Sequence, residues 1–254
     1  MLYKELDERD PNFSLNRQVV REGKGGGYAV RIQRSERALI EEIEQLIANA
    51  EALYKKETAE LPRIYFDRHL YQPLPVEYGD KVRMTPPGLN ESEAQFVRDM
   101  KAYWVREKDK SLAEAQVFLL RNLSRGSGIG FFEERGFYPD FVLWIVAGEE
   151  QHIVFIEPHG MLHAEAYQHD KKAQLHTRLP DLAREISARS GRGHITLDSY
   201  IVSATSYDDL RKKYDDGTWD IEKFAHAHIL FMEPGNEYDY IERIITEQLT
   251  RRST

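Results

Sequence analysis

Two carboxylates near the middle of the chain flank a pair of apolar segments, and their positions suit them to chemistry. Asp140 immediately precedes the run Phe141–Val146, and Glu157 immediately follows the run His152–Ile156. Both runs are rich in β-branched and aromatic residues, which is typical of strands, and the polar segment Gly148–Gln151 between them predicts a hairpin loop. Because an antiparallel hairpin returns to its own start, we expect both carboxylates at the same end of a sheet.

A metal ion is the partner that two converging carboxylates predict. Side chains alternate along a strand, so Glu157 and His159 should point to the same face. A carboxylate that ends an apolar strand is costly to bury unless a cation or a hydrogen-bond donor meets it. Asp140 and Glu157 supply hard oxygen ligands, which suit Mg²⁺, with Mn²⁺ as an alternative. The competing interpretation is two ordinary strand-end carboxylates in solvent, and composition taken alone favours it.

The sequence around these carboxylates resembles a known nuclease signature. Pro139-Asp140, a hydrophobic strand and then Glu157-Pro158-His159 are similar to the PD-(D/E)XK motif, with His159 where that family most often has lysine. The surrounding text, FLLRNLSRGSGIGFFEERGFYPDFVLWI and IVFIEPHGM, resembles the C-terminal nuclease region of DEAD/DEAH-type helicases related to type III restriction subunits. The resemblance covers roughly residues 28 to 250 and is strongest over residues 117 to 160.

This resemblance implies an α/β fold of the restriction-endonuclease-like kind, with a mixed sheet flanked by helices, and a metal-dependent DNA endonuclease. Asp140 and Glu157 would bind the metal, and His159 would orient or deprotonate the attacking water, a task that the family usually gives to lysine. Imidazole is the side chain that titrates near neutral pH, so it suits the role of base. The related helicases imply a restriction or anti-phage setting. The chain contains no GxxxxGK[ST] phosphate-binding loop, so any ATP-driven step would belong to an ATPase or helicase partner or to a missing motor region.

Other polar residues near the motif are candidates for contact with metal or DNA. Arg121 and Arg125 lie beside the turn Gly126-Ser127-Gly128, and guanidinium groups bind phosphate oxygens bidentately. An equally good interpretation is that this segment is a turn exposed to solvent, with no contact to phosphate. Glu134 would add a third carboxylate to the site, unless it pairs at the surface with Arg135.

Two further candidates follow the second strand. The spacing of leucines predicts a helix from about Glu165 to Ser187, with Pro180 as a kink or break. The resemblance implies a glutamine or a basic residue on this helix near the metal, and Gln174 is the candidate. Lys172 is a candidate for contact with DNA phosphate. The neighbouring histidines lack the shared short spacing of a zinc site; they are His163, His169 and His176.

The composition is that of a soluble protein with one large domain or a domain and an appendage. The chain has 254 residues, 31% of them charged, and no cysteine, which excludes disulfides and thiolate catalysis. It contains no apolar run of ~18 residues and no signal-peptide pattern, so we expect a cytoplasmic protein without membrane contact. The net charge of −8 argues against nucleic-acid binding by the whole surface but allows a local basic groove.

An N-terminal extension over residues 1–88 is expected to precede the nuclease-like core over residues 89–254. Residues 1–27 are polar and end in a glycine run, which indicates a turn before a strand at Tyr28–Ile32. The heptad-like spacing of Leu and Ile predicts an amphipathic helix from Ser35 to about Lys56. The segment Leu61–Pro75 indicates a strand and a loop.

The core should begin with a helix that runs from a capping box, Asn90 with Glu93, to about Glu107. Val117–Leu120 fits either a strand or a helix capped at Ser111, and the order of elements in the family favours the strand. Later strands are expected at 195–204 and 228–232, joined by an exposed acidic connector at 207–223 and followed by a closing amphipathic helix.

Two functions of different classes remain open from the sequence. The first is the metal-dependent DNA endonuclease. Cleavage of RNA is a third and weaker possibility, because a metal cluster acts on the phosphate and does not itself distinguish the sugar. The second is a catalytically inert nuclease-like fold that binds nucleic acid or a partner protein. The acidic net charge and His159 in place of lysine support this second interpretation. The sequence leaves the oligomeric state open.

Overall fold

The computed structural model divides the chain into two compact units, Met1–Ala94 and Gln95–Thr254. The boundary expected from the sequence lies between residues 88 and 89. The structure describes residues 2–5, 13–19, 29–33, 35–48, 63–64, 74–75, 82–85, 88–122, 138–161, 170, 172–190, 194–214, 217–233 and 239–251.

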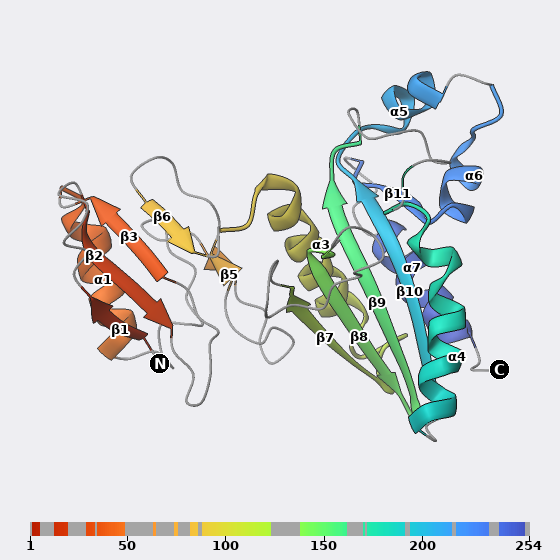
Figure 1. The fold of residues 1–254 in the computed structure, drawn as a ribbon, viewed down its shortest axis with the longest axis horizontal. Coiled ribbons are helices and arrows are strands. Elements are labelled where there is room, and N and C mark those ends of the chain that lie inside the picture. Colours follow the sequence, from red (N-terminus) through yellow and green to blue (C-terminus); the bar gives the residue numbers. More distant parts are fainter. Residues whose placement is uncertain are drawn as a thin grey trace. The chain divides into compact units, whose positions relative to one another are not determined.

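The N-terminal unit contains an antiparallel sheet of four strands in the order β1-β2-β3-β6 (Figure 1). Its strands are β1 (Leu2–Glu5), β2 (Phe13–Val19), β3 (Ala29–Gln33) and β6 (Val82–Thr85). The helix α1 (Arg37–Ala48) follows β3, and a separate short pair is formed by β4 (Arg63–Ile64) and β5 (Leu74–Pro75). A strand and a helix are found where they were predicted; the helix is described as far as Ala48, and the part expected from residue 49 to Lys56 lies outside the described residues. The strands β1 and β2 were not predicted.

The capping box predicted for the next helix is confirmed. The helix α3 (Glu91–Glu107) begins directly after Asn90. The Asn90 side-chain oxygen accepts a hydrogen bond from the Glu93 amide at 2.9 Å, and Glu93 Oε2 accepts one from the Asn90 amide at 2.8 Å. These two bonds satisfy amide groups that the first helical turn would otherwise leave without partners.

The C-terminal unit is built on a mixed sheet of five strands in the order β11-β10-β9-β8-β7. The strands β7, β8 and β9 are antiparallel to one another, while β10 is parallel to both β9 and β11. The strand bounds are β7 Ala115–Arg121, β8 Phe141–Ala147, β9 Glu150–His159, β10 Ile195–Ser203 and β11 Ile229–Phe231. The predicted order of strands, including the strand at residues 117–120, is therefore confirmed.

Helices flank this sheet on both faces (Figure 1). On one face, Leu179 and Ala183 of α4 (Leu179–Ser190) pack in a core cluster with Phe155 of β9. On the other face, Phe96 of α3 contacts Phe141 of β8 with ring centroids 5.2 Å apart. The closing helix α7 (Asp239–Thr250) has the apolar face predicted for it and is tied to α3 by a hydrogen bond from the Tyr240 hydroxyl to an Asp99 carboxylate oxygen. The coarse prediction of a mixed α/β sheet flanked by helices is thus confirmed.

Two local predictions were wrong. The helix expected from about Glu165 begins only at Leu179, because residues 172–178 form turns and a short 3-10 helix. Pro180 lies in the first turn of α4, where its nitrogen needs no intrahelical partner, which agrees with the break predicted there. The connector expected at residues 207–223 instead forms α5 (Tyr207–Tyr214) and leads into α6 (Ile221–His226). Trp219 lies between these helices and is buried with Phe224 against the sheet. The prediction missed this because most residues of the segment are polar.

A buried carboxylate joins β10 to the end of α7. Asp198 is 1% exposed and accepts hydrogen bonds from the Ser199 amide at 2.8 Å and from Gln248 Nε2 at 2.8 Å. It also forms ion pairs with His228 at 3.0 Å and with Arg251 at 2.6 Å. Burial by itself would raise the pKa of Asp198, but the hydrogen bond and charge of His228, together with Arg251, lower it below its ordinary value.

A stack of three rings covers this carboxylate. The His228 imidazole stacks on His176 at 4.1 Å and on Tyr200 at 4.5 Å between ring centroids. His228 is the one non-glycine residue with a positive φ in the described part of the chain, at 56°. His176 precedes α4 in the short 3-10 helix η3 (Leu175–Thr177). His163 and His169 of the histidine set considered for zinc lie outside the described residues.

Candidate active site

The β8–β9 hairpin brings Asp140 and Glu157 together at one end of the sheet. Its register pairs Phe141 with Ile156, and the Asp140 amide donates a hydrogen bond to Glu157 Oε2 at 3.2 Å. The turn of the hairpin is tight, and Gly148 adopts a φ of 62°, which glycine accepts without strain. Period-two alternation places Glu157 and His159 on one face of β9, as the sequence analysis expected.

Asn122 holds the segment that carries Asp140. Its amide nitrogen donates to the Asp140 carbonyl at 2.7 Å, and its side-chain Nδ2 donates to the Pro139 carbonyl at 2.8 Å. Asn122 is buried, so these bonds are shielded from water. The sequence analysis missed this residue, although an asparagine directly after a strand is a common partner for backbone groups. Arg121, which is opposite Phe141 in the ladder, lies at the same end of the sheet.

Glu157 is buried and already interacts with a cation. The residue is 7% exposed, and Lys172 Nζ lies 2.6 Å from its Oε1. The protein's own donors therefore engage both carboxylate oxygens, one through the Asp140 amide and one through Lys172. The Lys172 side chain is 44% exposed, so the ammonium lies between the buried carboxylate and solvent.

Asp170 fixes the backbone at Lys172. Its Oδ1 accepts hydrogen bonds from the Lys172 amide at 2.9 Å and from the Ala173 amide at 3.2 Å. This is the local turn that aspartate favours, and Asp170 itself is 9% exposed. Asp170 was not predicted as a site residue. An aspartate two residues before Lys172 is the sequence signal for such a turn. Gln174 was expected on a helix but lies in the turn before η3.

His159 is the last residue of β9 and pairs with Ser203 of β10. It is partly exposed, and its Nδ1 is buried without a hydrogen-bond partner in the described part of the chain. No side-chain contact between His159 and Glu157 is found among the described residues. The ammonium of Lys172, and not the imidazole of His159, is thus the basic group seen on the Glu157 carboxylate.

The remaining predicted contacts are only partly described. Arg125 and Glu134 lie outside the described residues. Within the described ranges, no group of three or more histidine, cysteine, aspartate or glutamate side chains could hold a metal. Asp140 and Glu157 carry the carboxylate oxygens that a hard divalent cation prefers, and one oxygen of Glu157 is paired with Lys172.

Comparison with known proteins found no family model, no curated protein and no solved structure that matches the chain. The nuclease resemblance thus stays a prediction from the sequence motif.

Across the described helices, none combines the length and the apolar character needed to cross a bilayer.

Proposed function

We propose that the protein is a metal-dependent endonuclease that hydrolyses phosphodiester bonds in DNA. The observation that carries this proposal is that Glu157 meets the backbone amide of Asp140 and the ammonium of Lys172 at one end of the five-stranded sheet. Two carboxylates and an ammonium are the side-chain types required by phosphodiester hydrolysis of the kind that the motif implies. The setting we propose is restriction or anti-phage defence in the cytoplasm, beside an ATPase or helicase partner.

Asp140 and Glu157 would hold the metal, Mg²⁺ or Mn²⁺. When bound, such an ion polarises the scissile phosphate and lowers the pKa of a coordinated water. Asn122 contributes by fixing the carbonyls of Pro139 and Asp140, which keeps the Asp140 backbone in place. Glu157 is kept in place by the Asp140 amide and by its own position in the sheet.

Lys172 takes the part of the lysine that the motif lacks at position 159. Glu157 holds its ammonium at 2.6 Å, and Asp170 fixes its backbone, so the charge has a defined position. Because the side chain is 44% exposed, the ammonium can also meet a phosphate oxygen and stabilise the negative charge that grows on it. His159, on the same face of β9 as Glu157, then remains available to accept a proton from the attacking water.

The test is cleavage of supercoiled plasmid and of linear double- and single-stranded DNA by the full chain with Mg²⁺, Mn²⁺ or EDTA. We expect metal-dependent nicking that is lost in Asp140→Asn and in Glu157→Gln, two nearly isosteric changes that remove a ligand charge. Glu149→Gln, in the exposed β8–β9 turn, is the matched control and should keep full activity. Wild-type cutting by either site variant, with circular dichroism unchanged, would end this mechanism. Cleavage of an RNA substrate of the same sequence tests whether the enzyme distinguishes DNA from RNA.

A second function is favoured by a specific observation. Both carboxylate oxygens of Glu157 are engaged by the protein itself, so this carboxylate has partners without a metal. This arrangement, with the net charge of −8, supports a nuclease-like module that binds nucleic acid or protein without catalysis. Thermal unfolding with Mg²⁺ or Mn²⁺ against EDTA separates the two functions, because the binding module has no reason to be stabilised by the metal.

A further inference from the structure

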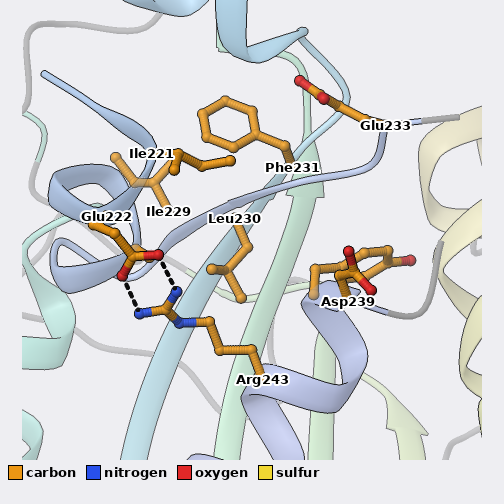
Figure 2. Close-up of a pocket in the computed structure, with 10 residues that line it drawn as sticks. Ile221, Glu222, Ile229, Leu230, Phe231, Glu233, Asp239 and Arg243 are labelled. Carbon is orange, nitrogen blue, oxygen red and sulfur yellow. Dashed lines mark hydrogen bonds and ion pairs between the residues drawn. The ribbon is translucent and has the colours of Figure 1, made fainter. Parts of the chain in front are cut away.

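A cavity of about 240 Å³ lies between α6, β11 and α7, and none of the candidate active-site residues lines it (Figure 2). Its apolar lining comes from all three residues of β11, with further side chains from the two helices. These apolar lining residues are Ile221, Ala225, Ile229, Leu230, Phe231 and Tyr240. Ile221 at the start of α6 is 51% exposed, which is unusual for isoleucine beside a cavity and extends the apolar surface outward.

The polar lining is strongly acidic. Three carboxylates and one guanidinium border the cavity. The guanidinium of Arg243 is committed, since it bonds both oxygens of Glu222 at 3.2 and 3.3 Å and Glu247 at 2.9 Å. Glu233 accepts a hydrogen bond from the Tyr207 amide at 2.8 Å, and no cationic side chain pairs with it in the described part of the chain.

The carboxylates without a cationic partner in the described chain lie on one side of the cavity. Figure 2 shows Glu233 and Asp239 on the side away from Glu222, with Leu230 and Phe231 between. Asp239 is exposed at the first turn of α7 and forms no ion pair within the described chain. The cavity therefore offers an apolar floor that leads to two carboxylates, which is complementary to a long aliphatic side chain with a cationic end.

We propose that this cavity receives an arginine side chain of a partner polypeptide. A volume of about 240 Å³ suits one large side chain, since cavities for drug-sized ligands are larger, from ~300 Å³ upward. The guanidinium presents several donors in a plane, which matches carboxylates better than the single ammonium of lysine does. The arginine stem would pack on Leu230, and its guanidinium can stack against the ring of Phe231.

The position of the cavity explains why the arginine would come from a polypeptide. The strand β11 is at the edge of the sheet, and its outer side has no strand partner in the described part of the chain. An extended partner segment that runs along such an edge can place one side chain in a neighbouring pocket, with the backbone supplying further hydrogen bonds. A free guanidinium compound would gain the charge contacts but none of these.

The test is NMR titration of the ¹⁵N-labelled full chain with the capped tripeptide Gly-Arg-Gly. We expect amide shifts confined to α6, β11 and the start of α7, with a Kd on the order of 1 mM. Gly-Leu-Gly should bind at least about fivefold more weakly, because it lacks the charge, and 0.5 M NaCl should weaken Gly-Arg-Gly through screening. Butylguanidine, which has no backbone, should bind no more tightly than the tripeptide.

The variants Glu233→Gln and Asp239→Asn test the charge directly. Glutamine keeps an oxygen that can accept the Tyr207 amide, so Glu233→Gln removes the charge while it preserves the local hydrogen bond. Each variant should raise the Kd of Gly-Arg-Gly by about tenfold relative to the control Glu149→Gln. Equal affinity for Gly-Leu-Gly, shifts outside the cavity, unaltered affinity in both variants or tighter binding of butylguanidine would each overturn the proposal.

Discussion

The ammonium of Lys172 lies 2.6 Å from Oε1 of Glu157, so the carboxylate that the nuclease motif assigns to a metal already holds a cation. A metal that binds this oxygen must share it with Lys172 or displace the ammonium. The same lysine can therefore affect metal binding and cleavage in opposite directions.

Substitution of Lys172 by methionine, which keeps an unbranched side chain one atom shorter and removes the charge, separates these two effects. We expect Lys172→Met to lower the cleavage rate by about 10²-fold, because it removes the positive charge beside the phosphate. The apparent affinity for Mn²⁺, measured by thermal shift, should rise because no ammonium competes for Glu157. The control is Lys212→Met on α5, where the lysine is exposed and pairs with Asp209. Full cleavage by Lys172→Met would contradict the role proposed for Lys172.

Substitution of Asp198 by alanine should destabilise the fold without any direct effect on the Glu157 site. It leaves the guanidinium of Arg251 and the hydrogen-bonding imidazole of His228 without their buried partner, which costs about 3 kcal/mol or more in the free energy of unfolding. Urea denaturation measures this loss, and Asp208→Ala on the exposed side of α5 is the control. A variant as stable as the wild type would show that the contacts of Asp198 do not contribute to the free energy of unfolding.

The lowered pKa of Asp198 also predicts how this contribution depends on pH. A carboxyl with a folded-state pKa below its unfolded value stabilises the protein above the unfolded value, near pH ~3.9, and loses this contribution as pH falls through the folded value. The difference in stability between wild type and Asp198→Ala should therefore persist at neutral pH and shrink below about pH 4.

His152 predicts a second pH dependence, in a higher range. The side chain is fully buried, its Nε2 has no hydrogen-bond partner among the described residues, and burial lowers the pKa of the imidazole. As pH falls below ~6.5, the unfolded chain takes up a proton before the folded chain does, so the free energy of unfolding decreases. The slope from one such group is at most about 1.4 kcal/mol per pH unit.

Urea denaturation between pH 7.5 and 5.5 checks this dependence. His152→Leu should show a shallower slope than wild type, although its stability at pH 7.5 is reduced by loss of the bond to Thr196. The slope should not vanish, because burial and the neighbouring His228 also lower the pKa of His176. The variant His194→Gln, at an exposed position, controls for removal of an imidazole as such. An identical slope in His152→Leu and wild type would contradict the prediction.

The central hairpin could be predicted from sequence because its information is local. Two β-branched runs around a glycine turn determine the pairing of β8 with β9, and the pairing alone brings Asp140 to Glu157. The capping box of α3 was predictable for the same reason, since its partners are three residues apart. In each case a short-range rule of backbone geometry was enough.

The contact of Lys172 with Glu157 could not be predicted in this way. It depends on how the turn at Asp170 and the helix α4 pack against the sheet, and that packing is set by contacts distant in sequence, such as Leu179 with Phe155. The helices α5 and α6 were missed for a related reason. Their segment is polar on average, and only the tertiary fold reveals that Trp219 and Phe224 are buried.

The brevity of β11 has a consequence for the edge of the sheet. The strand pairs only with residues 201–203 of β10, so residues 195–200 have no strand partner on that side in the described chain. The imidazole of His228 fills part of this gap, because its Nδ1 lies 3.0 Å from the Ser199 carbonyl as well as from Asp198. A side chain thus takes the hydrogen bond that a neighbouring strand would otherwise make. The Ser199 carbonyl is thereby already bonded and cannot pair with a strand of another molecule, a route to aggregation that open edges offer.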